Sequence, residues 1–112
     1  MLSFVAALKT AVNVPLYANQ CDDAGTCVVY DLNPLSYDGI KSKWRAKIQI
    51  RCNSMAEGLA IQSDISKRLC TVGDNQLTET VLTCRQNGGG WLEDGDKHVR
   101  IVYYEFLLNG GY

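Results

Sequence analysis

A chain of 112 residues is long enough for one domain around a single hydrophobic core, and too short for a second core of useful size. Its 46% hydrophobic and 21% charged residues are the composition of a soluble globular protein. The net charge of −1 provides no overall attraction to nucleic acid, membranes or acidic substrates. Only the local distribution of charge can therefore indicate a partner. We expect a single domain over residues 1–112.

The N-terminal segment predicts a helix followed by a short strand. Over residues 2–12, apolar side chains recur at the three- and four-residue spacing of a helix. Residues 14–18 predict a strand, and Pro15 assigns it to a sheet edge because proline donates no backbone hydrogen bond.

The next apolar run predicts a buried strand. Residues 26–32 are β-branched and almost entirely apolar, as in a strand that is covered on both faces. We expect Asn33 and Pro34 to end this strand, and residues 35–42 to form a connecting loop.

The clearest pattern in the chain is the alternation over residues 43–52. Apolar and polar side chains alternate strictly there, which is the period of a strand with one buried and one exposed face. The exposed side carries Gln49 and four bases, namely Lys43, Arg45, Lys47 and Arg51.

A helix is predicted over residues 54–70. Ser54 and Glu57 have the spacing of a capping box, in which each side chain accepts a hydrogen bond from a backbone N–H of the first turn. At 100° per residue one continuous arc is apolar and the opposite side is charged, so the helix should lie on a sheet. The predicted apolar arc consists of Met55, Ala56, Leu59, Ile61, Ile65, Leu69 and Cys70.

Two further strands are predicted, over residues 77–85 and 98–108, and a glycine-rich loop over residues 86–97 joins them. This order of elements predicts an α+β fold. We expect a mostly antiparallel sheet of four to five strands, with an N-terminal helix and one amphipathic helix packed on it.

The five cysteines are odd in number, form no CxxC pair and lie mostly in apolar runs, which favours buried reduced thiols over a disulfide framework. The apolar N-terminus lacks a positive n-region and is interrupted by Lys9, so we expect no signal peptide. The chain is therefore predicted to be cytosolic at synthesis.

No catalytic, cofactor or metal motif is apparent. Gly88, Gly89 and Gly90 lack the lysine and the Ser/Thr of a phosphate-binding loop. Cys84 and His98 could meet across a hairpin as nucleophile and base, but no third orienting residue is identifiable. Zinc ligands with close paired spacing are missing.

The basic strand face leaves three readings open. It can be a solvated or partner-facing surface, or a site for the nucleic-acid backbone, although it has no interleaved aromatic residue for base stacking. It can also be a subunit contact with acidic residues such as Asp22, Asp23, Glu93 and Asp94.

Trp91 and Leu92 are large apolar side chains in the predicted glycine-rich loop, next to Glu93 and Asp94. Trp91 can fold back over the sheet edge, or it can anchor another subunit. In the second case the acidic loop would fit a basic partner face, which allows a head-to-tail contact and a closed ring.

Five features of the chain occur together in this order. They are an N-terminal helix that leads into a proline segment (11–16), a buried strand ending in Asn-Pro (27–34), the run Ala-Lys-Ile-Gln-Ile-Arg-Cys (46–52) followed by Asn-Ser-Met-Ala-Glu-Gly (53–58), a glycine-tryptophan loop, and the closing run Tyr-Tyr-Glu-Phe-Leu-Leu-Asn (103–109). This arrangement resembles a known family, the minor capsid or tail terminator proteins of long-tailed bacteriophages.

The resemblance implies a non-enzymatic virion protein without cofactor, assembled in the host bacterial cytoplasm. It would form a ring, typically a hexamer, on the end of the tail tube, stop tube growth and join the tail to the head connector. Its partners would be further copies of itself, the tail tube protein and a head-completion or connector protein, with neither membrane nor specific nucleic acid. The residues expected at such contacts are Lys43, Arg45, Lys47, Arg51, Trp91, Leu92, Glu93 and Asp94. The alternative is a small nucleic-acid-binding module that uses the basic strand face.

Overall fold

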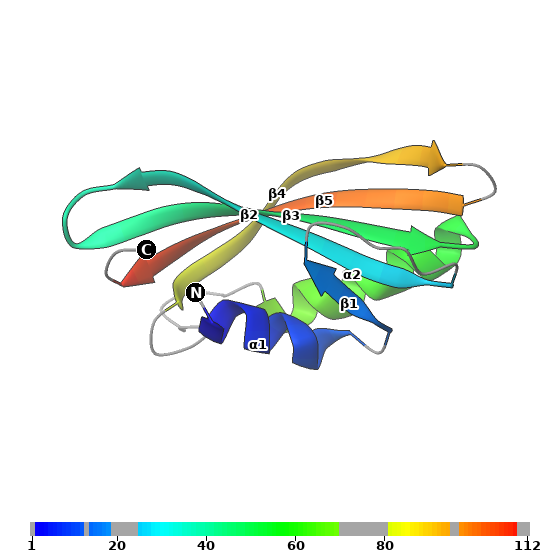
Figure 1. Cartoon of the computed structure of the whole chain (residues 1–112), viewed down its shortest axis with the longest axis horizontal. Helices are drawn as coiled ribbons and strands as arrows, with labels where there is room; N and C mark the ends of the chain where they lie inside the picture. Colours follow the sequence, from blue (N-terminus) through cyan, green and yellow to red (C-terminus); the bar gives the residue numbers. More distant parts are fainter. Residues whose placement is uncertain (1, 13, 19–24, 70–80, 95–96, 110–112) are drawn as a thin grey trace.

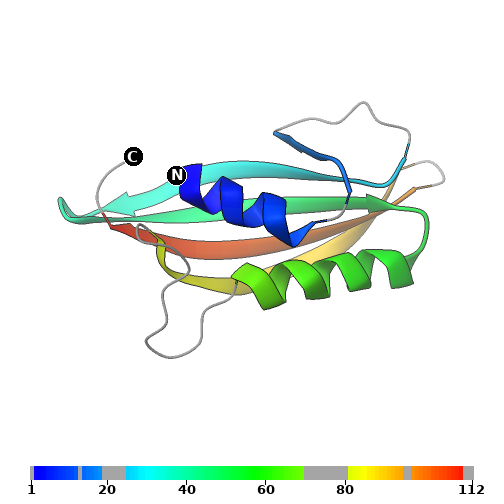
Figure 2. The same cartoon turned by 90° about the horizontal axis from the view of Figure 1, so that it is seen from below.

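A five-stranded sheet with two helices on one of its faces makes up the fold (Figures 1 and 2). The computed structural model describes residues 2–12, 14–18, 25–69, 81–94 and 97–109. The elements are α1 (Leu2–Ala11), β1 (Leu16–Ala18), β2 (Cys27–Tyr37), β3 (Lys41–Cys52), α2 (Met55–Leu69), β4 (Val81–Asp94) and β5 (Lys97–Asn109).

The strand order β1-β2-β3-β5-β4 confirms the predicted α+β class and the edge position of β1. β1 pairs with β2 in parallel, whereas the other three neighbouring pairs are antiparallel. The sheet is therefore mixed, and within the described ranges β1 and β2 form its one parallel pair. Figure 2 views the molecule from the helix side and shows α1 and α2 next to each other in front of the strands.

The predicted alternation along β3 is confirmed. Every second residue from Ser42 to Cys52 is buried, and the residues between them are exposed or half-buried. The buried row meets the inward side chains of β5 and both helices in one core, and the Trp44 and Phe106 rings stack there at 6.5 Å. The core consists of Leu8, Val28, Trp44, Ala46, Ile48, Ile50, Ile65, Leu69, Cys84, Val102, Tyr104, Phe106 and Leu108.

Helix α2 begins where the capping pair predicts. The Glu57 backbone N–H donates to Ser54 Oγ at 3.2 Å, and Glu57 Oε1 accepts from the backbone N–H of Asn53 at 3.0 Å. The glutamate thus reaches back one residue further than the capping box predicts. It also accepts a 2.8 Å hydrogen bond from the Thr26 hydroxyl, which ties the start of the helix to the start of β2.

The predicted apolar arc of α2 is wider than the face that the sheet covers. Gly58, Ile65 and Leu69 are buried, but Met55 is 50% exposed and Leu59 is 49% exposed. The helix lies on the sheet as predicted, but these two residues of the arc are not covered, because periodicity defines an arc and only the packing partner decides which part of it is covered.

Strand β2 continues past Asn33 and Pro34, so the prediction that these residues end it is wrong. The strand has a bulge between Pro34 and Ser36 and pairs with β3 as far as Tyr37. Within the described residues β1 covers only the first part of β2, and a proline is tolerated on such an edge because no neighbour needs its N–H. The predicted loop over residues 35–42 shrinks to the turn around Gly39.

The predicted glycine-rich loop is mostly strand, which is the largest correction to the sequence interpretation. β4 pairs with β5 as far as Asp94, opposite Lys97. A bulge between Gln86 and Gly89 absorbs the glycine run, and Gly88 adopts a φ of +84° there. Glycine also permits the close approach at position 89, where a Cβ atom would lie 2.4 Å from the Ile101 carbonyl oxygen.

The described cysteines are buried, as predicted, and Cys27, Cys52 and Cys84 form no disulfide. Cys21, Cys70, Asp22 and Asp23 lie outside the described residues, as do residues 77–80 of the predicted fourth strand.

Candidate interaction surface

The basic row of β3 lies on the sheet face that points away from the helices. Lys43 and Arg45 are exposed, and Lys47 and Arg51 are half-buried. β3 is the middle strand of the order, so β2 and β5 flank this row on both sides. We call this helix-free side of the sheet the open face.

Neighbouring strands break up the positive charge of the row. Lys43 Nζ lies 3.5 Å from Glu105 Oε2 on β5, and the Arg45 guanidinium lies 5.6 Å from the centroid of the Tyr103 ring. Lys47 pairs with Asp31 in the β2 register. The open face is therefore a surface of mixed charge that includes an aromatic ring. The neighbours Glu105, Tyr103 and Asp31 belong to β5 and β2, outside the alternating segment of β3.

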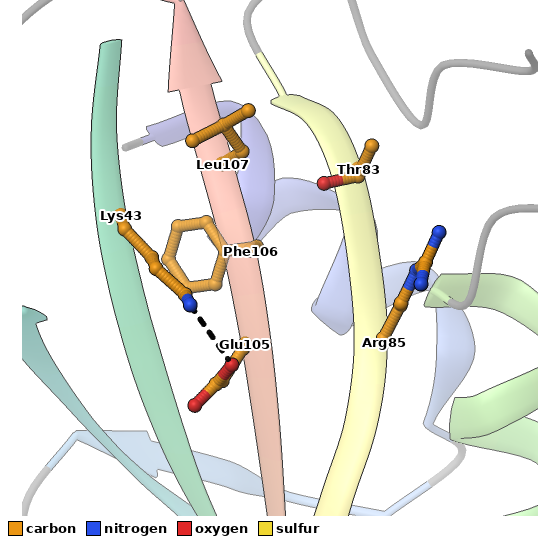
Figure 3. Close-up of a pocket in the computed structure, with 6 residues that line it drawn as sticks. All are labelled: Lys43, Thr83, Arg85, Glu105, Phe106 and Leu107. Carbon is orange, nitrogen blue, oxygen red and sulfur yellow. Dashed lines mark ion pairs between the residues drawn. The ribbon is translucent and has the colours of Figure 1, made fainter.

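A shallow hollow of about 350 Å³ opens on this face between β3, β5 and β4 (Figure 3). Glu105 lies in it between two bases, because Arg85 is its register partner on β4 and Lys43 forms the ion pair drawn in Figure 3. An exposed ion pair of this kind contributes little to stability, so its charges remain available to a partner. The hollow is lined by Lys43, Thr83, Arg85, Glu105, Phe106 and Leu107.

Trp91 lies on the other face of the sheet, under α2. A Cβ atom at Gly58 would lie 3.0 Å from Trp91 Cη2, so this glycine leaves the space that the indole occupies. The Arg100 guanidinium lies 5.4 Å from the centroid of the indole ring, and its Nε donates a 2.7 Å hydrogen bond to Gln62 Oε1 of α2. Trp91 therefore packs against its own chain and is half-buried, and its contact with another subunit stays a prediction.

The three residues after Trp91 were predicted to share a contact surface with it, and they are placed differently. Leu92 pairs with Val99 on the open face and is 56% exposed. Glu93 is exposed at the same end of the sheet, and the Asp94 backbone pairs with that of Lys97. The structure thus brings Leu92 to the same face as the basic row and separates it from Trp91.

The suggested pairing of Cys84 with His98 is wrong. Cys84 pairs with Phe106, eight residues along β5 from His98, which is about 26 Å in a strand. His98 pairs instead with Glu93 and Cys52, and its carbonyl oxygen accepts a hydrogen bond from the Cys52 thiol at 3.4 Å.

The titratable groups of the described residues do not gather into a reactive centre. Burial raises the pKa of the Cys52 thiol, and the Glu57 carboxylate raises it further, which makes that thiol a poor nucleophile. Among these residues no group of three His, Cys, Asp or Glu side chains is placed to hold a metal ion. Neither of the two described helices has the length and apolar character that a membrane span requires.

No protein-family model and no curated protein matches the chain. A solved structure does share its fold: a chain in the structure entitled "Virion of native gene transfer agent (GTA) particle" matches with a TM-score of 0.64 and 17% sequence identity. The match covers 94% of this chain and 86% of that chain. At this identity the likeness shows a common fold over almost the whole length of both chains.

Proposed function

We propose that the chain is a structural subunit of a phage-type virion, and in particular a tail terminator. In this role a ring of copies, a hexamer in the form we favour, sits on the end of the tail tube, stops its growth and joins the tail to the head connector. The observation that carries the proposal is the fold match to a chain of a gene transfer agent virion over 94% of the sequence.

The mechanism is steric and involves interfaces, with no bond made or broken. One surface of the ring matches the tube protein, and the opposite surface lacks what the next tube ring needs and matches a head-completion or connector protein. The open face supports such a role because it offers two exposed bases, Lys43 and Arg85, around a half-buried acid, Glu105, at the hollow. Charge complementarity of this kind selects partners and orients them.

The assembly test uses the purified chain together with a tail tube protein from the same genome. Negative-stain electron microscopy should show tubes that stop growing and carry a ring at one end when the chain is present, and tubes of uncontrolled length without it. A Lys43→Glu variant should bind tube ends or connector more weakly, whereas Lys67→Glu on the exposed side of α2 makes the same charge change away from the open face. Tubes that grow to the same lengths with and without the chain would contradict the proposal.

A nucleic-acid-binding module remains the second candidate, since the sheet brings the Tyr103 ring next to the basic row. Backbone binding by these bases would give an electrophoretic shift of DNA that weakens steeply with salt and is lost in a Lys43→Glu/Lys47→Glu variant. Absence of a shift at low salt would end this reading.

A further inference from the structure

The positive charge of the open face is concentrated around one carboxylate. Glu105 on β5 lies directly opposite Arg45 of β3 and directly opposite Arg85 of β4, and Lys43 Nζ lies 3.5 Å from its Oε2 atom. Side chains that are directly opposite on one face have Cβ atoms about 5 Å apart. Three bases from two strands therefore surround one acid, and we call Lys43, Arg45, Arg85 and Glu105 the Glu105 cluster.

A single carboxylate leaves most of this positive charge open to a partner. The Glu105 side chain is 24% exposed and the Lys43 side chain is 51% exposed, so the ion pair between them is in contact with water. Arg85 is exposed and forms no hydrogen bond or ion pair within the described part of the chain. Figure 3 shows Lys43 and Arg85 on opposite sides of the hollow, with Glu105 and Leu107 of β5 between them. Three bases against one acid leave an excess of two positive charges in the cluster.

The rest of the open face is closer to neutral. Lys47 is in register with Asp31 of β2, and Arg51 is half-buried. Four bases against three acids leave an excess of one positive charge outside the cluster. The open face therefore attracts an anionic partner mainly at the Glu105 cluster. The charged residues counted here, with those of the turns at both ends of the sheet, are Lys41, Lys47, Arg51 and Lys97 against Asp31, Asp38 and Asp94.

This distribution of charge favours a protein partner over nucleic acid. A nucleic-acid backbone carries phosphates at regular intervals and needs bases spread along its track. The cluster instead spans three neighbouring strands, a width of about 10 Å. The Tyr103 ring beside it is covered by the Arg45 guanidinium at 5.6 Å from its centroid, so that face of the ring is not available to a stacking nucleotide. Carboxylate side chains of a protein suit the cluster, because an arginine binds a carboxylate through two parallel N–H groups.

We propose that the Glu105 cluster binds an acidic segment of a protein partner, and that a partner carboxylate lies in the hollow between Lys43 and Arg85. Glu105 then acts as an internal competitor, because it occupies Lys43 in the free chain and the partner carboxylate displaces it in the complex. An exposed ion pair contributes little to stability, so this exchange costs little. The inference rests on the proposed function, since it names the chemistry of the surface that the open face would meet in the virion.

The test measures binding of a labelled acidic peptide, acetyl-Glu-Leu-Glu-Leu-Glu-Leu-Glu, to the full chain by fluorescence anisotropy at low salt. Arg85→Gln should raise the Kd about three- to fivefold, and Glu105→Gln should lower it about threefold, as expected for single exposed charge contacts. Lys67→Gln and Asp64→Asn make the same two charge changes at exposed positions of α2 and should leave the Kd unchanged. Circular dichroism should show all four variants folded, because none of the four substituted side chains is buried.

Equal effects of Arg85→Gln and Lys67→Gln, or no binding of the peptide at low salt, would overturn the inference. A DNA oligonucleotide of the same charge that binds more tightly than the peptide would overturn it too, because that result supports the nucleic-acid-binding module instead. These measurements need no tail tube protein, so their failure leaves the tube-length assay and the proposed function standing. If the peptide binds as expected while the chain leaves tube lengths unchanged, the proposed function fails and the binding site for acidic segments stands.

Discussion

Three adjacent glycines in β4 should respond differently to the same substitution. Gly89→Ala would place a Cβ atom 2.4 Å from the Ile101 carbonyl oxygen, far inside van der Waals contact, and both strands are joined there in a ladder. The backbone must shift to relieve this clash, and overpacking of this kind lowers the free energy of unfolding by about 1–3 kcal/mol. Gly88→Ala meets no atom within 4 Å but must adopt a φ of +84°, which costs an L-residue about 1–2 kcal/mol.

Gly90→Ala is the control within the same run. A Cβ atom at position 90 would meet nothing within 4 Å, and the φ of Gly90 is not positive. The free energy of unfolding of Gly90→Ala should therefore equal that of the unsubstituted chain or exceed it by about 0.5 kcal/mol, because alanine lowers the entropy of the unfolded state.

Urea unfolding followed by tryptophan fluorescence measures these differences. With a slope of about 1–3 kcal/mol per M, Gly89→Ala should lower the midpoint by about 1 M relative to Gly90→Ala. If the three variants agree within about 0.5 kcal/mol, the run is a loop, as its composition alone predicts, and the bulged strand described above is wrong.

Further substitutions separate packing from association. Trp91→Ala removes a half-buried ring from the underside of α2 and should lower the free energy of unfolding by about 2 kcal/mol, as measured by urea titration. Leu92→Ala should change the free energy of unfolding by less than about 0.5 kcal/mol in the same titration. It should instead weaken self-association, as measured by sedimentation. Tyr104→Phe deletes a buried hydroxyl that lies 2.6 Å from Ser66 Oγ, and calorimetry should show a loss of about 1 kcal/mol. The hydrogen bond from the Asn53 N–H, and to a smaller extent that from the Thr26 hydroxyl, lowers the pKa of Glu57 in the folded state. The stability that the Glu57 carboxylate contributes is therefore complete above the ordinary glutamate pKa of about 4.3, and it is lost as the pH falls through the lower pKa of the folded state. A Glu57→Gln variant should therefore lose less stability between pH 5 and pH 3 than the unsubstituted chain, and equal losses would show that these bonds do not act on the charged form.

Local patterns in the sequence are enough to determine most of the elements. The alternation along residues 43–52 predicts β3 and its exposed basic row, because side chains in a strand point to opposite faces in turn. Ser54 and Glu57 predict the start of α2, because the first-turn N–H groups of any helix need acceptors. These predictions are correct because both patterns depend only on residues that are close together in the sequence.

The tertiary structure decides whatever depends on partners that are distant in sequence. Glycine disfavours strands on its own, but β5 offers a complete ladder to residues 81–94 and a bulge absorbs the excess, so the predicted loop becomes a strand. Likewise, the helical period defines an apolar arc on α2, while the position of the sheet under that helix decides that Met55 and Leu59 remain exposed.

The candidate surfaces divide in the same way. The basic row is readable from the sequence, but Glu105, Tyr103 and Arg85 join it only through the registers of β3, β5 and β4. The placement of Trp91 under α2 and Leu92 on the open face follows from those registers too, since a single step along a strand reverses the face of a side chain. Residue order therefore determined which side chains could share a face, and the pairing of distant strands decided which of them meet.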